Sequence, residues 1–249
     1  MLGRLARELL FPGPRLVVWV RHGKAEHNKR PAEEKKKLPY SSYGYKLVDI
    51  GRKQSAVTGA WLRTHFGAFD VYYTSTYVRS RESMEIMYPG VAYTEDARLA
   101  EVRKGVESIL SEAQIHAFAP WEDERIEKEG PYHYRPWGGE AWSDVEMRLR
   151  SFKLDLRARH SGKTVLISSH GKVISIDRKI ELGLLHEEIV HQHRVLHVRQ
   201  ENASVTIYRR VWDQANLRFA LKLDPKEHNI VPWSQEPWGA EELAEPAAS

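Results

Sequence analysis

Two histidines, each at the end of a short apolar run, are the residues of this sequence best placed to do chemistry. The run 16–20 leads directly into Arg21 and His22, and the run 165–167 is followed, after two serines, by His170. Short apolar runs of this kind predict buried strands. Ligands of open α/β sheets bind just beyond the carboxyl ends of strands. We therefore expect both histidines at a ligand-binding edge of one sheet.

The residue types gathered there favour phosphoryl transfer. A neutral imidazole is a good nucleophile at physiological pH, and the Arg21 guanidinium offers a planar fork of donors that matches a phosphate. The helix predicted after Gly171 directs its free N–H groups at the same place. An anion site that holds a nucleophile fits transfer through a phosphohistidine, with cationic side chains in place of a metal ion.

The elements that must position these residues alternate between strand and helix, which predicts a mostly parallel sheet with covering helices. Helical spacing of apolar residues is clearest over 142–160, where Ser143 and Glu146 match a capping box. The predicted strands are 16–20, 70–75, 91–94 and 165–167; the predicted helices are 51–66, 77–87, 142–160 and 172–185; and antiparallel closing strands are expected at 195–208 and 218–223.

We expect one catalytic domain over residues 1–233, with an ordered insertion or lid at about 107–137. Gly, Pro and aromatic residues are dense at the end of that insertion, where Tyr132, His133, Tyr134 and Trp137 either line a substrate site or pack the insertion onto the body. Residues 234–249 carry glutamates and no Lys or Arg, and a disordered acidic tail is expected there.

Composition narrows the function classes. The chain of 249 residues has 41% hydrophobic and 29% charged residues, which is ordinary for a globular protein, and no apolar run is long enough to span a membrane. The absence of cysteine excludes disulfides, thiolate catalysis and Cys-ligated zinc, and suits a cytoplasmic protein. The net charge is +4, with positive residues spread along the chain apart from 35–37. A small anionic substrate is therefore favoured over a nucleic acid.

A second group of histidines does not predict a metal site. Its members have no recognised ligand spacing and few acidic neighbours, so exposed or substrate-facing positions are expected for them. They are His186, His191, His193 and His197.

Taken in order along the chain, several short motifs resemble those of the histidine phosphatase superfamily, the branch that contains cofactor-dependent phosphoglycerate mutase. The segment 21–28 resembles the motif Arg-His-Gly-x-x-x-x-Asn, and 73–79 resembles Tyr-Ser-Ser-Pro-Leu-x-Arg. The segment 99–105 fits Leu-x-Glu-x-x-x-Gly, and 169–171 fits the second histidine. Shorter matches lie at 47–54 and 138–141. This resemblance implies a three-layer α/β/α sandwich, phosphoglycerate mutase-like, with an antiparallel edge strand.

The resemblance also implies roles for residues at the matching positions. His22 would attack phosphorus, and Glu101 would protonate the leaving oxygen and later activate water. His170 would assist at the phosphoryl group. The phosphoryl oxygens would be bound by Arg21, Asn28, Arg79 and Gly171.

Some alternatives stay open at this point. Arg81 could be the phosphate-binding arginine in place of Arg79. Glu95 or Asp96 could be the general acid in place of Glu101. Lys24 and Ala25 replace the Glu-Ser pair usual after Arg-His-Gly, and Ala141 replaces a usual Ser, which changes hydrogen bonding around the site.

The resulting expectation is a metal-independent, cofactor-free phosphatase that hydrolyses a small phosphorylated substrate and releases inorganic phosphate. A phosphoglycerate-type mutase is the second hypothesis, although the mutase segments Tyr-Gly-x-Leu-x-Gly-x-Asn-Lys and Arg-Arg-x-x-x-x-Pro-Pro do not occur here. A non-catalytic phosphoanion-binding module is the third. Neither nucleic acid nor membrane is an expected partner, and the natural substrate and the oligomeric state are left open, with a dimer as one option.

Overall fold

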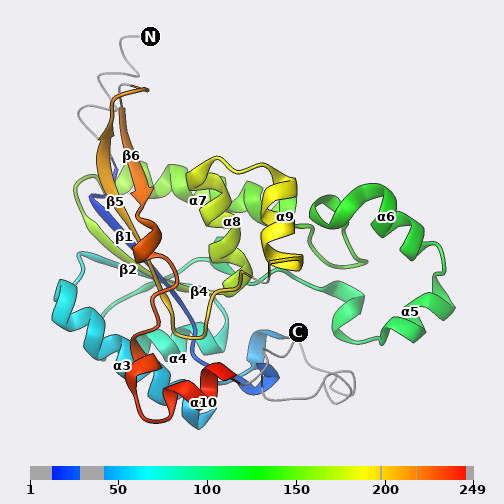
Figure 1. Cartoon of the computed structure of the whole chain (residues 1–249), viewed down its shortest axis with the longest axis horizontal. Coiled ribbons are helices and arrows are strands. Elements are labelled where there is room, and N and C mark those ends of the chain that lie inside the picture. Colours follow the sequence, from blue (N-terminus) through cyan, green and yellow to red (C-terminus); the bar gives the residue numbers. More distant parts are fainter. Residues whose placement is uncertain (1–12, 29–41, 197, 217, 245–249) are drawn as a thin grey trace.

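The computed structural model describes residues 13–28, 42–196, 198–216 and 218–244 (Figure 1). Within them lies one sheet of six strands in the order β3-β2-β4-β1-β5-β6. The strands are β1 (Leu16–Arg21), β2 (Val71–Thr74), β3 (Thr94–Glu95), β4 (Thr164–Ser169), β5 (Val205–Asp213) and β6 (Arg218–Leu223). The first four run parallel, and β5 and β6 add antiparallel pairs at one side, which confirms the predicted sheet.

Strand β1 lies inside the sheet because its side chains are apolar on both faces. It pairs in parallel with β4, with Arg21 opposite Ser169, and antiparallel with β5 on its other side. This register carries His22 and His170 off the sheet at the same edge, as the sequence predicts. Parallel strands covered on both faces characteristically have continuous apolar runs of this type.

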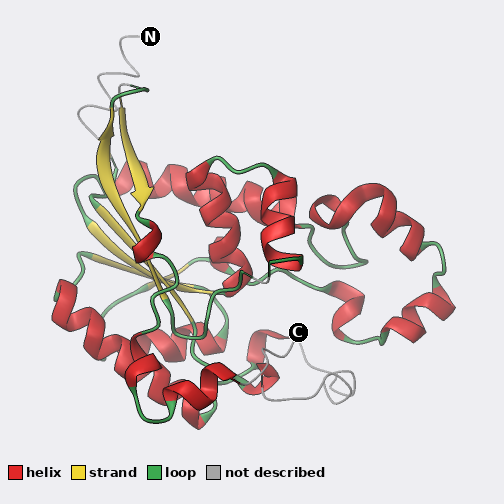
Figure 2. Cartoon of the chain, viewed as in Figure 1, coloured by secondary structure: helices red, strands yellow, loops and turns green. Residues whose placement is uncertain are grey.

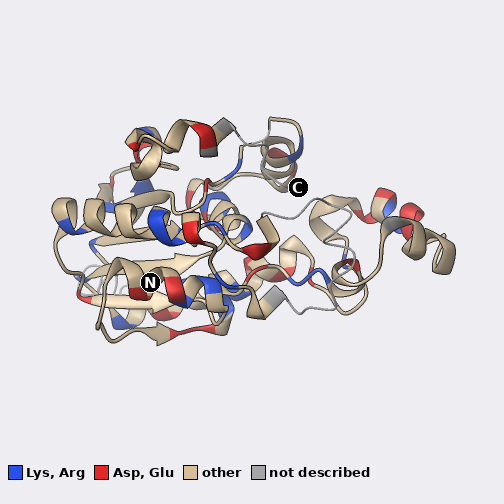
Figure 3. Cartoon of the chain, turned by 90° about the horizontal axis from the view of Figure 1, so that it is seen from below, with Lys and Arg blue, Asp and Glu red and all other residues tan. Residues whose placement is uncertain are grey.

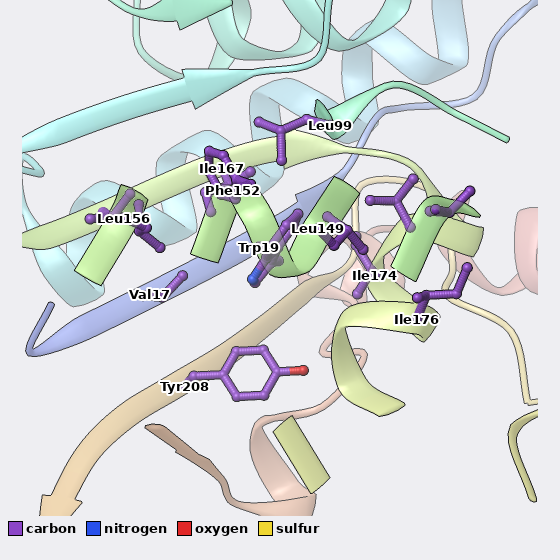
Figure 4. Close-up of a cluster of buried hydrophobic side chains, with 13 residues drawn as sticks. Val17, Trp19, Leu99, Leu149, Phe152, Leu156, Ile167, Ile174, Ile176 and Tyr208 are labelled. Carbon is purple, nitrogen blue, oxygen red and sulfur yellow. The ribbon is translucent and has the colours of Figure 1, made fainter. Parts of the chain in front are cut away.

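Helices α7 (Trp142–Arg159) and α8 (Gly171–Leu182) cover one face of the sheet. Their apolar stripes pack on alternate side chains of the strands, such as Trp19 from β1 and Phe152 from α7, whose ring centroids lie 6.4 Å apart (Figure 4). Full burial of such side chains contributes roughly 1.5–3 kcal/mol each. Helices α3 (Asp49–Phe66) and α4 (Val78–Met87) cover the opposite face, with Leu62 and Met84 in its core.

The insertion, residues 107–137, projects away from the sheet as a helical arm (Figure 2). It contains α5 (Glu112–Phe118) and α6 (Glu122–His133), and η3 (Ala97–Leu99) and η4 (Gly105–Ser108) lead into it. Its base is closed at Gly105, which has a positive φ of 54° and packs against the backbone of Trp137 so tightly that a Cβ would overlap it. Only glycine fits there.

Some element boundaries differ from the sequence predictions. The helix α7 starts from Ala141, whose N–H donates to Asp144 Oδ2 at 2.8 Å, so Ser143 lies inside the first turn and the predicted capping box is wrong. The strand predicted at 91–94 is displaced to Thr94–Glu95. The predicted strand 195–208 begins only at Val205, because the preceding residues follow a helix, α9 (His186–Arg194).

The chain after β6 packs against the body for most of its described length. Short helices follow β6: η5 (Pro225–Glu227), η6 (Pro232–Gln235) and α10 (Gly239–Ala244). Trp233 is 1% exposed, and its ring stacks with Trp238 at 5.8 Å. Residues 234–244 of the predicted tail thus include the end of η6 and helix α10, next to an indole that is buried in the body. Residues 245–249 lie outside the described residues.

Charged residues of both signs are mixed along the chain. In Figure 3, Lys and Arg are interspersed with Asp and Glu rather than gathered in one continuous basic band. Within the described ranges, no helix combines the length and apolarity that crossing a membrane requires.

Candidate active site

The nucleophile candidate His22 follows β1 directly, and its backbone is fixed from two sides. Its N–H donates to the Ser169 carbonyl at 3.0 Å. Its own carbonyl accepts the Ala203 N–H at 3.1 Å and the Asn202 Nδ2 amide at 3.2 Å. Strand β4 and the turn before β5 thus hold the residue, and its side chain is 1% exposed.

Hydrogen bonds define which nitrogen of His22 is available. Nδ1 lies 2.7 Å from the Gly23 carbonyl, which only accepts, so Nδ1 carries the proton. Nε2 accepts from Arg79 Nε at 3.0 Å. Burial, with the positive charge of Arg79 and its neighbours, lowers the pKa of His22 well below its usual value. The ring is therefore neutral at physiological pH, with its lone pair on Nε2.

Gly23 permits the close approach of helix α3 behind this ring. A Cβ at Gly23 would overlap the Gly51 carbonyl, and one at Gly51 would overlap the backbone of Lys24. The Gly23 N–H donates to Ser83 Oγ at 3.0 Å, which ties the same turn to α4. Glycine at both positions lets the helices support the nucleophile loop directly.

Arg79 comes from the first turn of α4 and is 2% exposed. Its guanidinium lies over the Tyr77 ring, 4.7 Å from the centroid. Burial lowers its pKa to about 10, which still leaves it protonated at neutral pH. The competing Arg81 points elsewhere, to Glu95 at 3.3 Å in an exposed ion pair.

His170 completes the group from the end of β4. Its ring centroid lies 5.1 Å from that of His22, and its Nε2 lies 2.8 Å from Ser75 Oγ. Burial and the charge of Arg79 lower its pKa well below the usual value. Its Nδ1 has no hydrogen-bond partner within the described part of the chain.

Arg21 also has an unused donor. One guanidinium nitrogen donates to the Gln200 carbonyl, whereas Nε is buried without a partner among the described residues. Gly171 lies against this side chain, since a Cβ there would be 3.4 Å from Arg21 Nε. Buried polar atoms are nearly always paired in native proteins. The unpaired atoms of Arg21 and His170 beside the His22 ring therefore indicate a place for an anion.

Glu101 lies at the border of this group, with its side chain 23% exposed. Its Oε2 is 3.9 Å from His170 Nδ1, beyond hydrogen-bond range, and its Oε1 accepts the Val102 N–H at 2.9 Å. The alternatives lie elsewhere: Asp96 binds Arg98 at 2.7 Å, and Glu95 pairs with Arg81. Of these carboxylates, Glu101 is the one that approaches the histidines.

Asn28 has a local contact that its predicted role does not include. Its Oδ1 accepts the Ala25 N–H at 3.0 Å and closes the short helix η1 (Glu26–Asn28). Sequence reasoning also missed Ser75, the hydroxyl partner of His170, and His27, whose ring lies 5.9 Å from that of His22. A serine after a strand and a histidine in a polar loop carry no signal strong enough to single them out.

The second histidine group is dispersed in the structure. His186 packs on Tyr132 at 5.6 Å between ring centroids, and His193 contacts Lys172. His197 lies outside the described residues. No group of metal-ligating side chains with metal-site geometry occurs within the described ranges.

Comparison with known proteins places this fold and site in a family. A model of the histidine phosphatase superfamily (branch 1) matches residues 17–220, and the chain belongs to that superfamily. A relative from Methylocella silvestris, named 2,3-bisphosphoglycerate-dependent phosphoglycerate mutase, is 30% identical over 168 residues, which cover 63% of this chain and 76% of the relative.

Several solved structures of the same fold are named as phosphatases. A mycobacterial glucosyl-3-phosphoglycerate phosphatase, solved with VO3, superposes with a TM-score of 0.62 at 22% identity, over 84% of this chain and 98% of that one. An alpha-ribazole phosphatase from Shigella flexneri gives 0.64 at 16% identity, over 87% and 98%. These similarities establish the three-layer fold that the sequence predicts.

Proposed function

We propose that this protein is a metal-independent phosphatase that hydrolyses phosphomonoesters through a phosphohistidine on His22. One observation carries the proposal. The neutral His22 ring presents its Nε2 lone pair beside Arg79, with unpaired buried nitrogens on Arg21 and His170 close by. A phosphoryl group is an acceptor that satisfies these donors and places phosphorus next to a nucleophile.

In the first step, Nε2 attacks phosphorus in line with the leaving oxygen. The N–P bond forms as the P–O bond to the leaving group breaks. Arg21 and Arg79 neutralise the non-bridging oxygens, His170 helps to orient them, and Asn28 and the N–H groups at Gly171 are proposed to assist. Protonated Glu101 gives its proton to the departing alkoxide.

In the second step, water replaces the alcohol. The Glu101 carboxylate takes a proton from the water, whose oxygen attacks phosphorus while the N–P bond breaks. Inorganic phosphate leaves, and His22 regains its neutral form with Nδ1 still donating to Gly23. The partial exposure of Glu101 supports this role, because water reaches a carboxylate that also faces the site.

A phosphomutase is the second candidate, and the mutase names of the curated relatives favour it. The chemistry of the first step is the same. The two functions differ in the acceptor of the phosphoryl group, which is water in a phosphatase and a second hydroxyl in a mutase. The phosphatase names of the structural neighbours support hydrolysis.

The test is a panel of phosphomonoesters that includes p-nitrophenyl phosphate and 3-phosphoglycerate with bisphosphoglycerate, each with and without a chelator. We expect phosphate release that survives chelation, and at least about a 10⁴-fold loss in His22→Ala. The exposed His116→Ala is the matched control, which should retain full activity. Isomerisation without phosphate release would favour the mutase. If the protein shows no turnover and forms no acid-labile phosphoenzyme, the binding module is the hypothesis that remains.

A further inference from the structure

Lys172 stands beside the catalytic group but has no part in the chemistry above. It follows Gly171 in the first turn of α8, and its side chain is only partly buried. Its ammonium nitrogen lies 3.5 Å from the centre of the Trp142 ring and 2.7 Å from His193 Nε2. Three helices, α7, α8 and α9, thus contribute one side chain each to this cluster.

The cluster carries an excess of positive charge. Among the charged groups of the described residues that act most strongly on Lys172, Glu101 attracts it, whereas Arg199, Lys104 and Arg194 repel it. Burial, reinforced by these cations, lowers the pKa of Lys172 to about 6. An added anion here would relieve the repulsion.

Other buried lysines of the same two helices are neutralised in the ordinary way. Lys179, two turns further along α8, lies 2.9 Å from Glu146, and Lys153 of α7 lies 2.5 Å from Asp177. Lys172 makes no such ion pair with the described residues; its contacts are the indole face and the imidazole. An indole face attracts a cation without neutralising it, so Lys172 in its protonated form can still bind an anion.

The contact between Lys172 and His193 also limits how many protons the pair can hold. A hydrogen bond between Nζ and Nε2 needs a lone pair on one of them, so the pair carries at most one positive charge in this geometry. An anion that accepts from Lys172 or His193 removes that limit, since each nitrogen can then hold its own proton. Binding of an anion and uptake of a proton are thereby linked.

We propose that Lys172, His193 and Trp142 form a second anion subsite, which selects phosphomonoesters whose leaving group carries another anionic group and takes up a proton when that group binds. The inference rests on the proposed function, in which Glu101 serves the leaving group, because Glu101 also attracts the Lys172 ammonium. The shared chemistry is an oxyanion, either a carboxylate or a second phosphate.

Three non-hydrolysable ligands test this directly in the wild-type protein: propylphosphonate, 3-phosphonopropionate and 1,3-propanediphosphonate. Isothermal titration calorimetry at pH 7.5 in two buffers of different ionisation enthalpy gives both the Kd and the number of protons taken up. We expect 3-phosphonopropionate or the diphosphonate to bind about 10-fold more tightly than propylphosphonate, with extra proton uptake. The stronger of the two identifies the carboxylate or the phosphate as the preferred anion.

Variants assign the effect to the cluster. Lys172→Met should abolish both the preference and the extra proton uptake, and Lys172→Arg should keep most of the preference. His193→Gln should keep the preference in part but lose the extra uptake. The matched control is Lys222→Met on β6, an exposed lysine opposite Arg209, at the far end of the sheet from His22.

The outcomes separate the two proposals. Suppose the enzyme hydrolyses p-nitrophenyl phosphate but binds propylphosphonate as tightly as the two ligands that carry a second anionic group. That result would overturn the subsite alone. A preference that survives in a folded Lys172→Met protein would also overturn it. Failure of all three phosphonates to bind, together with no turnover of p-nitrophenyl phosphate, would overturn the proposed function and the subsite with it.

Discussion

The candidate site and the insertion are built by opposite means. Around His22, the backbone is paired to strand β4 and to the turn before β5, and the side chains of Arg79 and His170 are almost fully buried. In the insertion, the helices are held by local contacts, such as the reciprocal hydrogen bonds of Ser111 and Gln114 at 3.2 and 2.8 Å. Three of its aromatic residues are exposed, namely Phe118, Trp121 and Trp137, at 67%, 51% and 40%, whereas Tyr132 is buried.

The difference teaches which part of the molecule tolerates change. Residues that are distant in sequence share one rigid sheet edge at the candidate site, so a shift of any of them displaces the rest. Many bonds of the insertion join near neighbours, and its surface ion pairs, such as Arg125 with Glu129 at 3.0 Å, contribute little. Its end is tied to α7, since Tyr132 donates to Glu146. The candidate site is therefore fixed by the sheet, and we expect the insertion to tolerate change better.

The largest expected effect at the sheet edge, after loss of His22 itself, comes from Glu101→Gln. A glutamine cannot protonate the leaving oxygen, so kcat for alkyl phosphates should fall by about 10²–10⁴-fold. The fall should be much smaller for p-nitrophenyl phosphate, whose leaving group needs no proton. Steady-state kinetics across a series of leaving groups measures this, with the exposed Glu95→Gln as control. An equal loss on every substrate would contradict the role of Glu101 as the acid.

Arg79→Lys should lower kcat/KM by about 10²-fold, since an ammonium keeps the charge but not the fork of donors beside His22. The same change at Arg81, two residues along the same helix and paired with Glu95, provides the control. Both variants are compared with p-nitrophenyl phosphate as substrate. Similar losses at the two positions would mean that the helix, rather than the Arg79 side chain, matters for the reaction.

The buried histidines predict a separation between activity and stability as the pH falls. Because the folded-state pKa values of His22 and His170 lie below the usual 6.5, the unfolded chain binds protons first. Stability is therefore complete above pH 6.5 and declines below it, by up to about 1.4 kcal/mol per pH unit for each histidine. The His22 ring stays neutral over the first part of this decline, because its folded-state pKa lies well below 6.5.

Urea unfolding between pH 7.5 and 5 measures this dependence. In His22→Gln, the free energy of unfolding should decline less steeply below pH 6.5, because the contribution of His22 is gone. The acidic limb of the wild-type kcat/KM profile should lie below pH 6.5. An identical pH dependence of stability in both proteins would refute the linkage.

The smallest expected effect lies in the insertion. Trp121→Ser should change the free energy of unfolding by no more than about 0.5 kcal/mol, because half of the indole is already in water. Phe152→Ala, at 1% exposure in the core under β1, should cost about 3–5 kcal/mol. Chemical denaturation compares the two, and a large loss at Trp121 would show that the insertion is coupled to the body more tightly than its contacts suggest.

Much of the sheet was predictable because its signals are local. An apolar run that stops at a charged or polar residue indicates a buried strand, and this located Arg21, His22 and His170 on one edge. The motif spacing then added Arg79 and Glu101, which the structure brings to the same place. Their roles in the reaction stay predictions.

The parts that escaped prediction depend on tertiary contacts or on weak local patterns. Helix α9 is rich in His, Glu and Gln, with Ile189 as its one fully buried residue, so its apolar periodicity is faint. The tail is anchored through Trp233, whose burial depends on a turn about 30 residues earlier. In the sequence, Lys172 looks like an ordinary helical lysine, and only the structure shows its contacts with Trp142 and His193.

The position of β1 inside the sheet has a consequence for biosynthesis. The strand that delivers His22 is synthesised well before its two neighbours, because β4 and β5 follow it by roughly 150 and 190 residues. Pairings so distant in sequence form slowly, and an unpaired apolar strand invites aggregation. The nascent chain must therefore keep β1 out of wrong pairings until β5 has been synthesised.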